Sequence, residues 1–290
     1  MNQAAGSRDR TMIVAIAAAV SFLGLESLSF VIGQYQVAIF LQVSFYVYLF
    51  LIFWQSFVFD LHLKGVHPIR RGLKERFGYM LERGHWLHFQ NYLVLPGVIY
   101  WMTVALLYLR PFEEAFKQTV IVFSTLALTI GFWYLKKTFY RHGEASRNTR
   151  QLIFLAKVYA SYLAFAASLG VVRYFGLGVG LFVAVVFCLT FLLFYQAFFQ
   201  HHSLNFAAFR LMLAAGSLLA ILAYIIFYIW NVNYYSAALV LTAFYNTIWG
   251  VIHHQYIDRD LTREIVLEYV AVLFLILVIV FSTTNFAERI

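Results

Sequence analysis

Long runs of apolar residues, separated by short polar segments, follow one another along almost the whole chain. Each run approaches the ~20 residues that a helix needs to cross a bilayer, and none alternates between apolar and polar residues as a barrel strand does. The sequence therefore predicts an all-α fold, a polytopic membrane helical bundle of about nine transmembrane helices. The predicted helices span residues 11–32, 37–59, 91–109, 116–136, 152–174, 178–200, 209–231, 235–254 and 264–284.

Composition supports a membrane location. Hydrophobic residues make up 63% of the 290 residues and charged residues only 12%, whereas soluble domains are roughly half apolar and about a quarter charged. The connections are short except for residues 60–90, a basic segment that contains four histidines. We expect a single transmembrane helical domain over residues 1–290.

Basic residues and histidines mark one face of the predicted bundle. Counted against the predicted helices, most of the 21 Lys and Arg residues fall on the same face as all nine histidines. Positive charge is retained in the cytoplasm, so the histidines, segment 60–90 and the amino terminus are predicted to be cytoplasmic. The carboxy terminus is then outside a plasma or inner membrane. The net charge of +8 follows from this rule and from anionic membrane lipids, without a nucleic-acid partner.

Several predicted helices bring histidines to that face. A histidine or a histidine pair occurs at the ends of the second, sixth and eighth predicted helices and at the start of the third. Imidazole is the commonest metal ligand, so histidines from several helices at one level predict a metal site. Interfacial histidines beside aromatic anchors are the alternative interpretation. The candidate metal ligands are His62, His85, His88, His201, His202, His253 and His254.

Two aspartates and a tyrosine are candidate catalytic residues. Asp60 lies two residues before His62, and Asp258 lies five residues after His253. From such positions a carboxylate can bind a metal or orient an imidazole. Tyr245 lies two helical turns before His253 on a polar and aromatic stripe, at a depth where lipid-facing residues are aliphatic. This stripe predicts a helix face turned towards the bundle interior.

Three other charges lie inside predicted helices. Glu26 and Arg173 each lie near the outer end of a helix, where an intramembrane carboxylate needs a partner, so these two could pair. Lys157 lies five residues into the fifth helix, and its side chain is expected to reach the cytoplasmic surface by snorkelling.

This arrangement resembles two groups of integral-membrane iron enzymes. In architecture it is similar to fatty acid desaturases and hydroxylases, whose histidine boxes lie at cytoplasmic helix ends around a di-iron centre, although their HxxxH and HxxHH boxes are absent. It also resembles Brp/Blh-type bacterial carotenoid oxygenases, which cleave β-carotene. The stretch 195–206 is similar to that family's aromatic helix ending in histidine, and 251–258 is similar to its histidine–aspartate element; its Pro-His-Gly box is missing.

The sequence thus predicts a membrane-bound, metal-dependent oxidoreductase that uses O2 and holds one or two non-haem iron ions. A long hydrophobic substrate, such as a carotenoid, isoprenoid or fatty acyl lipid, would enter from the bilayer, and an electron donor is a candidate partner. Two alternatives stay open. One is a haem b and quinone electron-transfer protein, which would leave most of the nine histidines without a role. The other is a non-catalytic transporter or scaffold whose histidines contact headgroups.

Overall fold

All regular secondary structure in the described part of the chain is helical, with no strand, which confirms the all-α prediction. The computed structural model describes the backbone of residues 2–32, 36–58, 83–109, 114–140, 147–201, 203–230 and 233–284. Within these ranges, side chains are described for residues 12–32, 36–55, 94–109, 114–133, 152–199, 201, 203–230 and 233–284.

Every predicted helix is present. The described helices are α1 (Asn2–Val31), α2 (Val37–Val58), α4 (Arg83–Tyr108), α5 (Glu114–Tyr140), α6 (Arg147–Tyr174), α7 (Val179–Gln200), α8 (Phe206–Ile229), α9 (Tyr234–Ile252), the π-helix η2 (His253–Asp258) and α10 (Arg263–Thr283). Three helices, α1, α4 and α6, begin several residues before their predicted starts, because the polar residues that precede their apolar runs continue the helix. Hydropathy alone locates the apolar run and not the polar turns beyond it.

Eight of the described helices are long and apolar enough to cross a membrane, and α4 contributes a shorter apolar stretch, Val94–Tyr108. Helices are suited to this role because every interior backbone N–H and C=O is satisfied within the segment. By helix length and composition, the chain is a multi-pass membrane protein.

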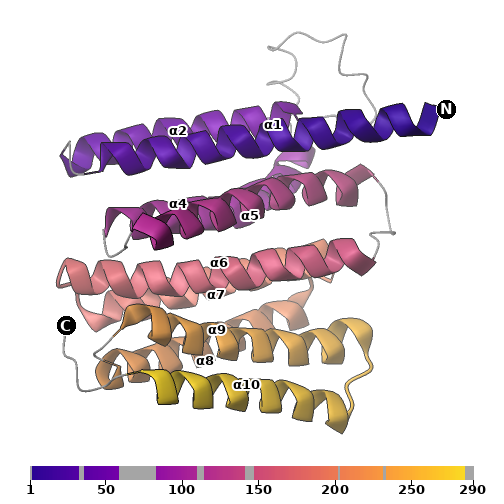
Figure 1. Ribbon diagram of the computed structural model, residues 1–290. Helices are drawn as coiled ribbons and strands as arrows, with labels where there is room; N and C mark the ends of the chain where they lie inside the picture. The colour runs from indigo at the N-terminus through magenta and orange to yellow at the C-terminus, as the bar shows by residue number, and fades with distance from the viewer. Residues whose placement is uncertain are drawn as a thin grey trace. The chain divides into compact units, whose positions relative to one another are not determined.

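The chain divides within α6 into two compact units, residues 1–156 and 157–290. The helices of each unit are labelled in Figure 1. The single domain predicted over the whole chain stays a prediction, and each unit has its own packing and its own polar contacts.

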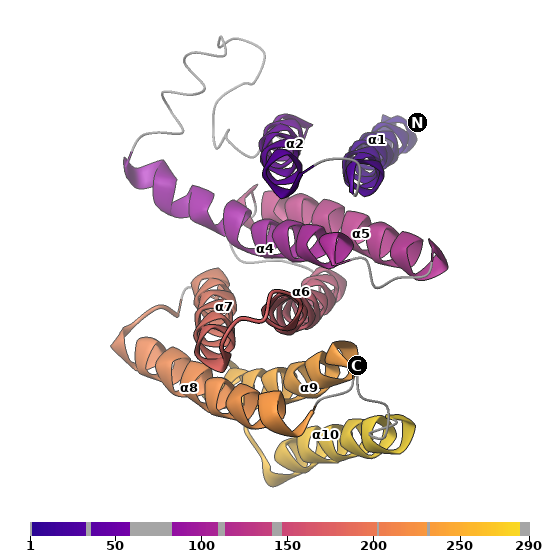
Figure 2. The same ribbon diagram turned by 90° about the vertical axis from the view of Figure 1, so that its left-hand side faces the viewer.

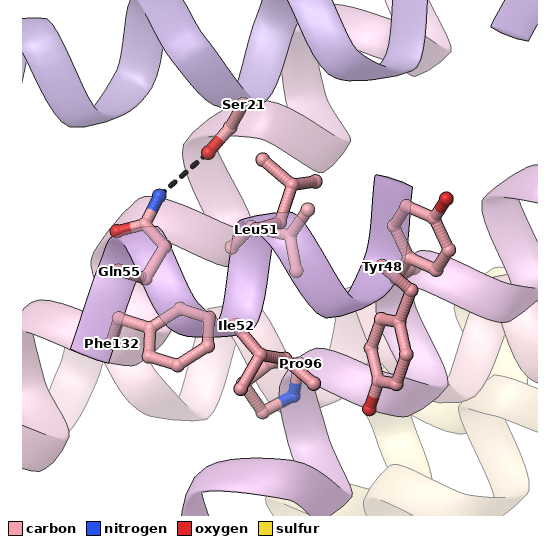
Figure 3. Close-up of a pocket in the computed structure, with 9 residues that line it drawn as sticks. Ser21, Tyr48, Leu51, Ile52, Gln55, Pro96 and Phe132 are labelled. Atoms are coloured by element: carbon pink, nitrogen blue, oxygen red, sulfur yellow. Dashed lines mark hydrogen bonds between the residues drawn. The ribbon is translucent and has the colours of Figure 1, made fainter. Parts of the chain in front are cut away.

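In the first unit, α1 packs against α2 and α5, and α4 packs against α5 (Figure 2). Two hydrogen bonds connect its helices: Gln55 Nε2 donates to Ser21 Oγ at 2.6 Å, and the Tyr100 hydroxyl donates to the Ser44 carbonyl at 2.6 Å. A small cavity beside Gln55 has room for about one water molecule (Figure 3). Such hydrogen bonds between helices hold together elements that lipid would otherwise solvate equally well.

In the second unit, α7 packs along α8, α8 contacts α9, and α9 packs against α10 (Figures 1 and 2). Asparagine caps begin two of these helices: Asn205 Oδ1 accepts from the Ala208 amide, and Asn233 Oδ1 accepts from the Tyr235 amide. The caps satisfy backbone donors that have no partner within their helix.

The two charges expected to pair have other partners. Glu26 accepts a hydrogen bond from Gln118 Nε2 at 2.9 Å. Arg173 donates to the Trp230 carbonyl, and its guanidinium lies 5.9 Å from the centre of the Phe227 ring. Each charge therefore finds its hydrogen-bond partner within its own unit.

Gly250 allows α9 and α10 to approach each other closely. A Cβ atom at this position would overlap the ring of Tyr269 on α10. We expect Gly250→Ala to destabilise the protein by about 1–3 kcal/mol, because the rigid ring must move. Thermal unfolding in detergent measures the effect. Gly180→Ala is the matched control, because a Cβ there meets no atom within 4 Å and alanine favours helix. Equal unfolding temperatures for Gly250→Ala and the wild-type protein would contradict this packing.

Candidate metal centre

Two histidines and an aspartate lie together where α9 ends. The ligand atoms offered by His253, His254 and Asp258 all lie within 4.8 Å of one another. His253 Nδ1 is 3.0 Å from Asp258 Oδ2, and His254 Nδ1 is 3.7 Å from the same oxygen. All three side chains are partly exposed, so the group is open on one side. Two imidazoles and one carboxylate are the donor set of non-haem iron(II) oxygenases with open coordination positions.

The π-helix η2 brings these residues onto one face. On an α-helix, residues five apart diverge by about 140°, so Asp258 would point away from His253. The i→i+5 hydrogen bonding of a π-helix places residues five apart on the same face. Asp258 lies five residues after His253 and four after His254, so one carboxylate reaches both imidazoles. Single π-turns are rare in helices and occur frequently at functional sites.

A second aspartate orients His254. Asp260 Oδ1 lies 2.8 Å from His254 Nδ1, which leaves the Nε2 atom of that ring available to a metal. The turn that brings Asp260 back depends on Arg259, whose left-handed backbone (φ 58°) ends the helix with its N–H bonded to the His254 carbonyl. A carboxylate on the second ring nitrogen is the usual way of fixing a metal-binding imidazole.

His201 adds a third imidazole. It caps α7, and its ring centre lies 5.0 Å from that of His253, with the two rings nearly perpendicular. This edge-to-face contact leaves no room for a porphyrin between these two imidazoles. The structure thus brings His201 from α7 together with the end of α9, and its role as a metal ligand stays a prediction.

Aromatic rings form a floor beneath the histidines. The Trp249 ring contacts His253 at 5.6 Å between ring centres and lies 5.4 and 5.7 Å from the rings of Phe194 and Phe198. Trp249 and both phenylalanines are buried. On one side, Tyr256 of η2 donates to Asn205, the residue that caps α8. These rings pack against the bundle side of the cluster and connect α7 to α9 through side-chain contacts.

The other predicted site residues either lie away from the cluster or are not fully described. Tyr245 is buried between the rings of Phe165 and Phe194, about 12 Å along the helix from His253, so its contacts are with the aromatic interior. The face of α9 that carries Tyr245 is therefore interior, as predicted. His85 and His88 lie in the first turns of α4, with side chains outside the described ones. Asp60, His62 and His202 lie outside the described residues.

Two residues beside the candidate centre were not among the predicted site residues. Asp260 follows the helix, and only the left-handed turn at Arg259 directs it back to His254. Lys157 was expected to snorkel, and this prediction is wrong: its side chain is buried, with the ammonium 5.8 Å from the centre of the Trp249 ring.

Comparisons of the chain with protein-family models, with curated proteins and with solved structures find no match. The case for a metal centre therefore rests on the geometry of these residues.

Proposed function

We propose that the protein is a membrane-bound oxidoreductase that holds non-haem iron at the end of α9 and uses O2 to oxidise a long hydrophobic molecule. The observation that carries the proposal is the grouping of His253, His254 and Asp258 on a single π-turn, with their ligand atoms within 4.8 Å of one another. Among divalent metals, a donor set of two imidazoles and one carboxylate suits iron(II) and would leave positions open for oxygen.

In this proposal each residue has a defined task. His253, His254 and Asp258 bind the metal, and Asp260 holds the His254 ring in place through Nδ1. His201 packs against His253 and restricts its rotation. The aromatic floor of Trp249, Phe194 and Phe198 keeps water from the bundle side, where reactive species would otherwise be quenched. When bound, iron supplies the oxygen-activating chemistry that protein side chains lack.

The substrate class follows from the surroundings. Aromatic and aliphatic side chains surround the aromatic floor, and the chain crosses a membrane, so an apolar molecule can reach the centre from the bilayer without crossing water. A carotenoid, an isoprenoid or a fatty acyl lipid meets this description. An external electron donor is part of the proposal if the reaction needs more electrons than the substrate supplies.

We further propose that the histidine end of the bundle faces the cytoplasm of a plasma or inner membrane, with the amino terminus inside and the carboxy terminus outside. The excess of Lys and Arg on the histidine face supports this orientation, because positive charge is retained on the cytoplasmic side.

Metal analysis of the protein, purified without a polyhistidine tag, tests the proposal. We expect about one iron ion per chain, or two if histidines outside the described residues complete a second site, and no intense Soret absorption band. A Soret band that scales with protein would replace this function with haem-based electron transfer. A protein free of iron after anaerobic incubation with Fe²⁺ would contradict any iron-dependent function.

A further inference from the structure

Lys157 is a buried charge inside an apolar helix. Only 5% of its surface is exposed, and it lies five residues into the apolar span 152–174, about 7 Å along α6. Its ammonium lies over the ring of Trp249, 5.8 Å from the ring centre. The side chain therefore reaches α9, which belongs to the same unit as Lys157.

The contacts of Lys157 do not balance its charge. In the described part of the chain, no carboxylate lies within ion-pair distance of its ammonium. A cation–π contact recovers only part of the free energy that removing an ammonium from water costs. Ionisable side chains inside a membrane span almost always have a polar or charged partner, and a negatively charged ligand is one that would keep Lys157 protonated.

That missing partner would lie next to the proposed metal centre. The Trp249 ring, over which the Lys157 ammonium lies, also contacts two histidines. Its centre is 5.6 Å from that of His253 and 6.4 Å from that of His201. With a divalent metal bound, the charges of Asp258 and Asp260 offset the metal and leave the charge of Lys157 uncompensated. A ligand with one negative charge would bring the summed charge of the metal, the two aspartates and Lys157 to zero.

We propose that Lys157 binds the carboxylate of a long-chain carboxylic acid, which makes free fatty acids and similarly acidic apolar molecules the substrate class of the metal centre. The inference rests on the proposed function. A free acid has a small headgroup that can reach an ammonium inside the span, whereas the phosphate of a phospholipid is held at the interface by its glycerol and two chains. The acyl chain of the acid remains in apolar surroundings.

Competition binding in a neutral detergent tests this selectivity. A fluorescent long-chain fatty acid is bound to the purified, untagged protein and displaced by oleic acid, oleyl alcohol or phosphatidic acid. We expect oleic acid to act at a concentration at least about tenfold lower than oleyl alcohol, the contribution of a hydrogen bond between charged groups. Phosphatidic acid acting as strongly as oleic acid would overturn the assignment to a free acid.

Three variants locate the effect. In the Lys157→Met variant, oleic acid and oleyl alcohol should displace the probe at equal concentrations. In the Lys157→Arg variant, oleic acid should remain the stronger competitor. Lys117→Met is the matched control, because Lys117 lies on α5 and pairs with Glu114 at 2.8 Å, so its loss should leave the preference intact. Retention of the preference in Lys157→Met would overturn the inference. If that variant does not fold, equal binding of acid and alcohol by the wild-type protein overturns it as well.

Metal analysis of the same preparations separates this inference from the proposed function. Normal iron content with no preference for the acid would contradict the acid site at Lys157 and leave the proposed function standing. A preference for the acid in a protein that binds no iron removes the proposed function and leaves an acid-binding site at Lys157.

Discussion

Leu204→Cys is expected to react with a membrane-impermeant thiol reagent only from the cytoplasmic side, and Leu177→Cys only from the outside. Leu177 lies between α6 and α7, and Leu204 lies between α7 and α8, so the single span α7 separates them. Both leucines are 39% exposed, so a difference in labelling reflects the side of the membrane and not access to the side chain. The measurement is labelling of intact cells compared with inverted membrane vesicles.

The labelling needs a background without the native thiol. Cys188 is the one cysteine of the chain and is exposed on α7, so Cys188→Ala serves as the parent and as the unlabelled control. Labelling of both positions from the same side would break the topology, because α7 could then not span the membrane. Labelling with the two sides exchanged would keep the spans and reverse the proposed orientation.

The membrane helices could be predicted from the sequence because length and hydropathy are local properties. A run of about 20 apolar residues must satisfy its backbone internally in lipid, whatever its neighbours are, and helix is the solution for a continuous run. The main errors are at helix starts such as that of α4, where polar residues continue the helix outside the apolar run.

The candidate metal centre could be predicted only in part. The histidine pair at 253–254 and the nearby Asp258 are visible in the sequence, but the sequence offers no reason for two adjacent residues to face one carboxylate. The π-turn provides that reason, and π-turns have no sequence rule comparable to hydropathy. Asp260 and Lys157 depend on a left-handed residue and on tertiary packing, which are equally invisible to local patterns.

Removing single groups from the centre should lower the affinity for Fe²⁺ in a defined order. His253→Ala and Asp258→Asn each remove a proposed ligand, so we expect a loss greater than the roughly 10–100-fold that outer partners of metal ligands contribute. Asp260→Asn removes only the partner of His254 Nδ1, so a loss within that 10–100-fold range is expected. Glu264→Gln is the matched control, since it neutralises an exposed carboxylate in the first turn of α10.

Anaerobic titration of the untagged His253→Ala protein with Fe²⁺, beside the wild-type and Glu264→Gln proteins, tests the central claim most directly. The proposed centre predicts tight binding of at least one Fe²⁺ ion by the wild-type and control proteins and a loss of more than about a hundredfold in affinity for His253→Ala. Equal Fe²⁺ affinity in the wild-type and His253→Ala proteins would contradict a metal centre at the end of α9.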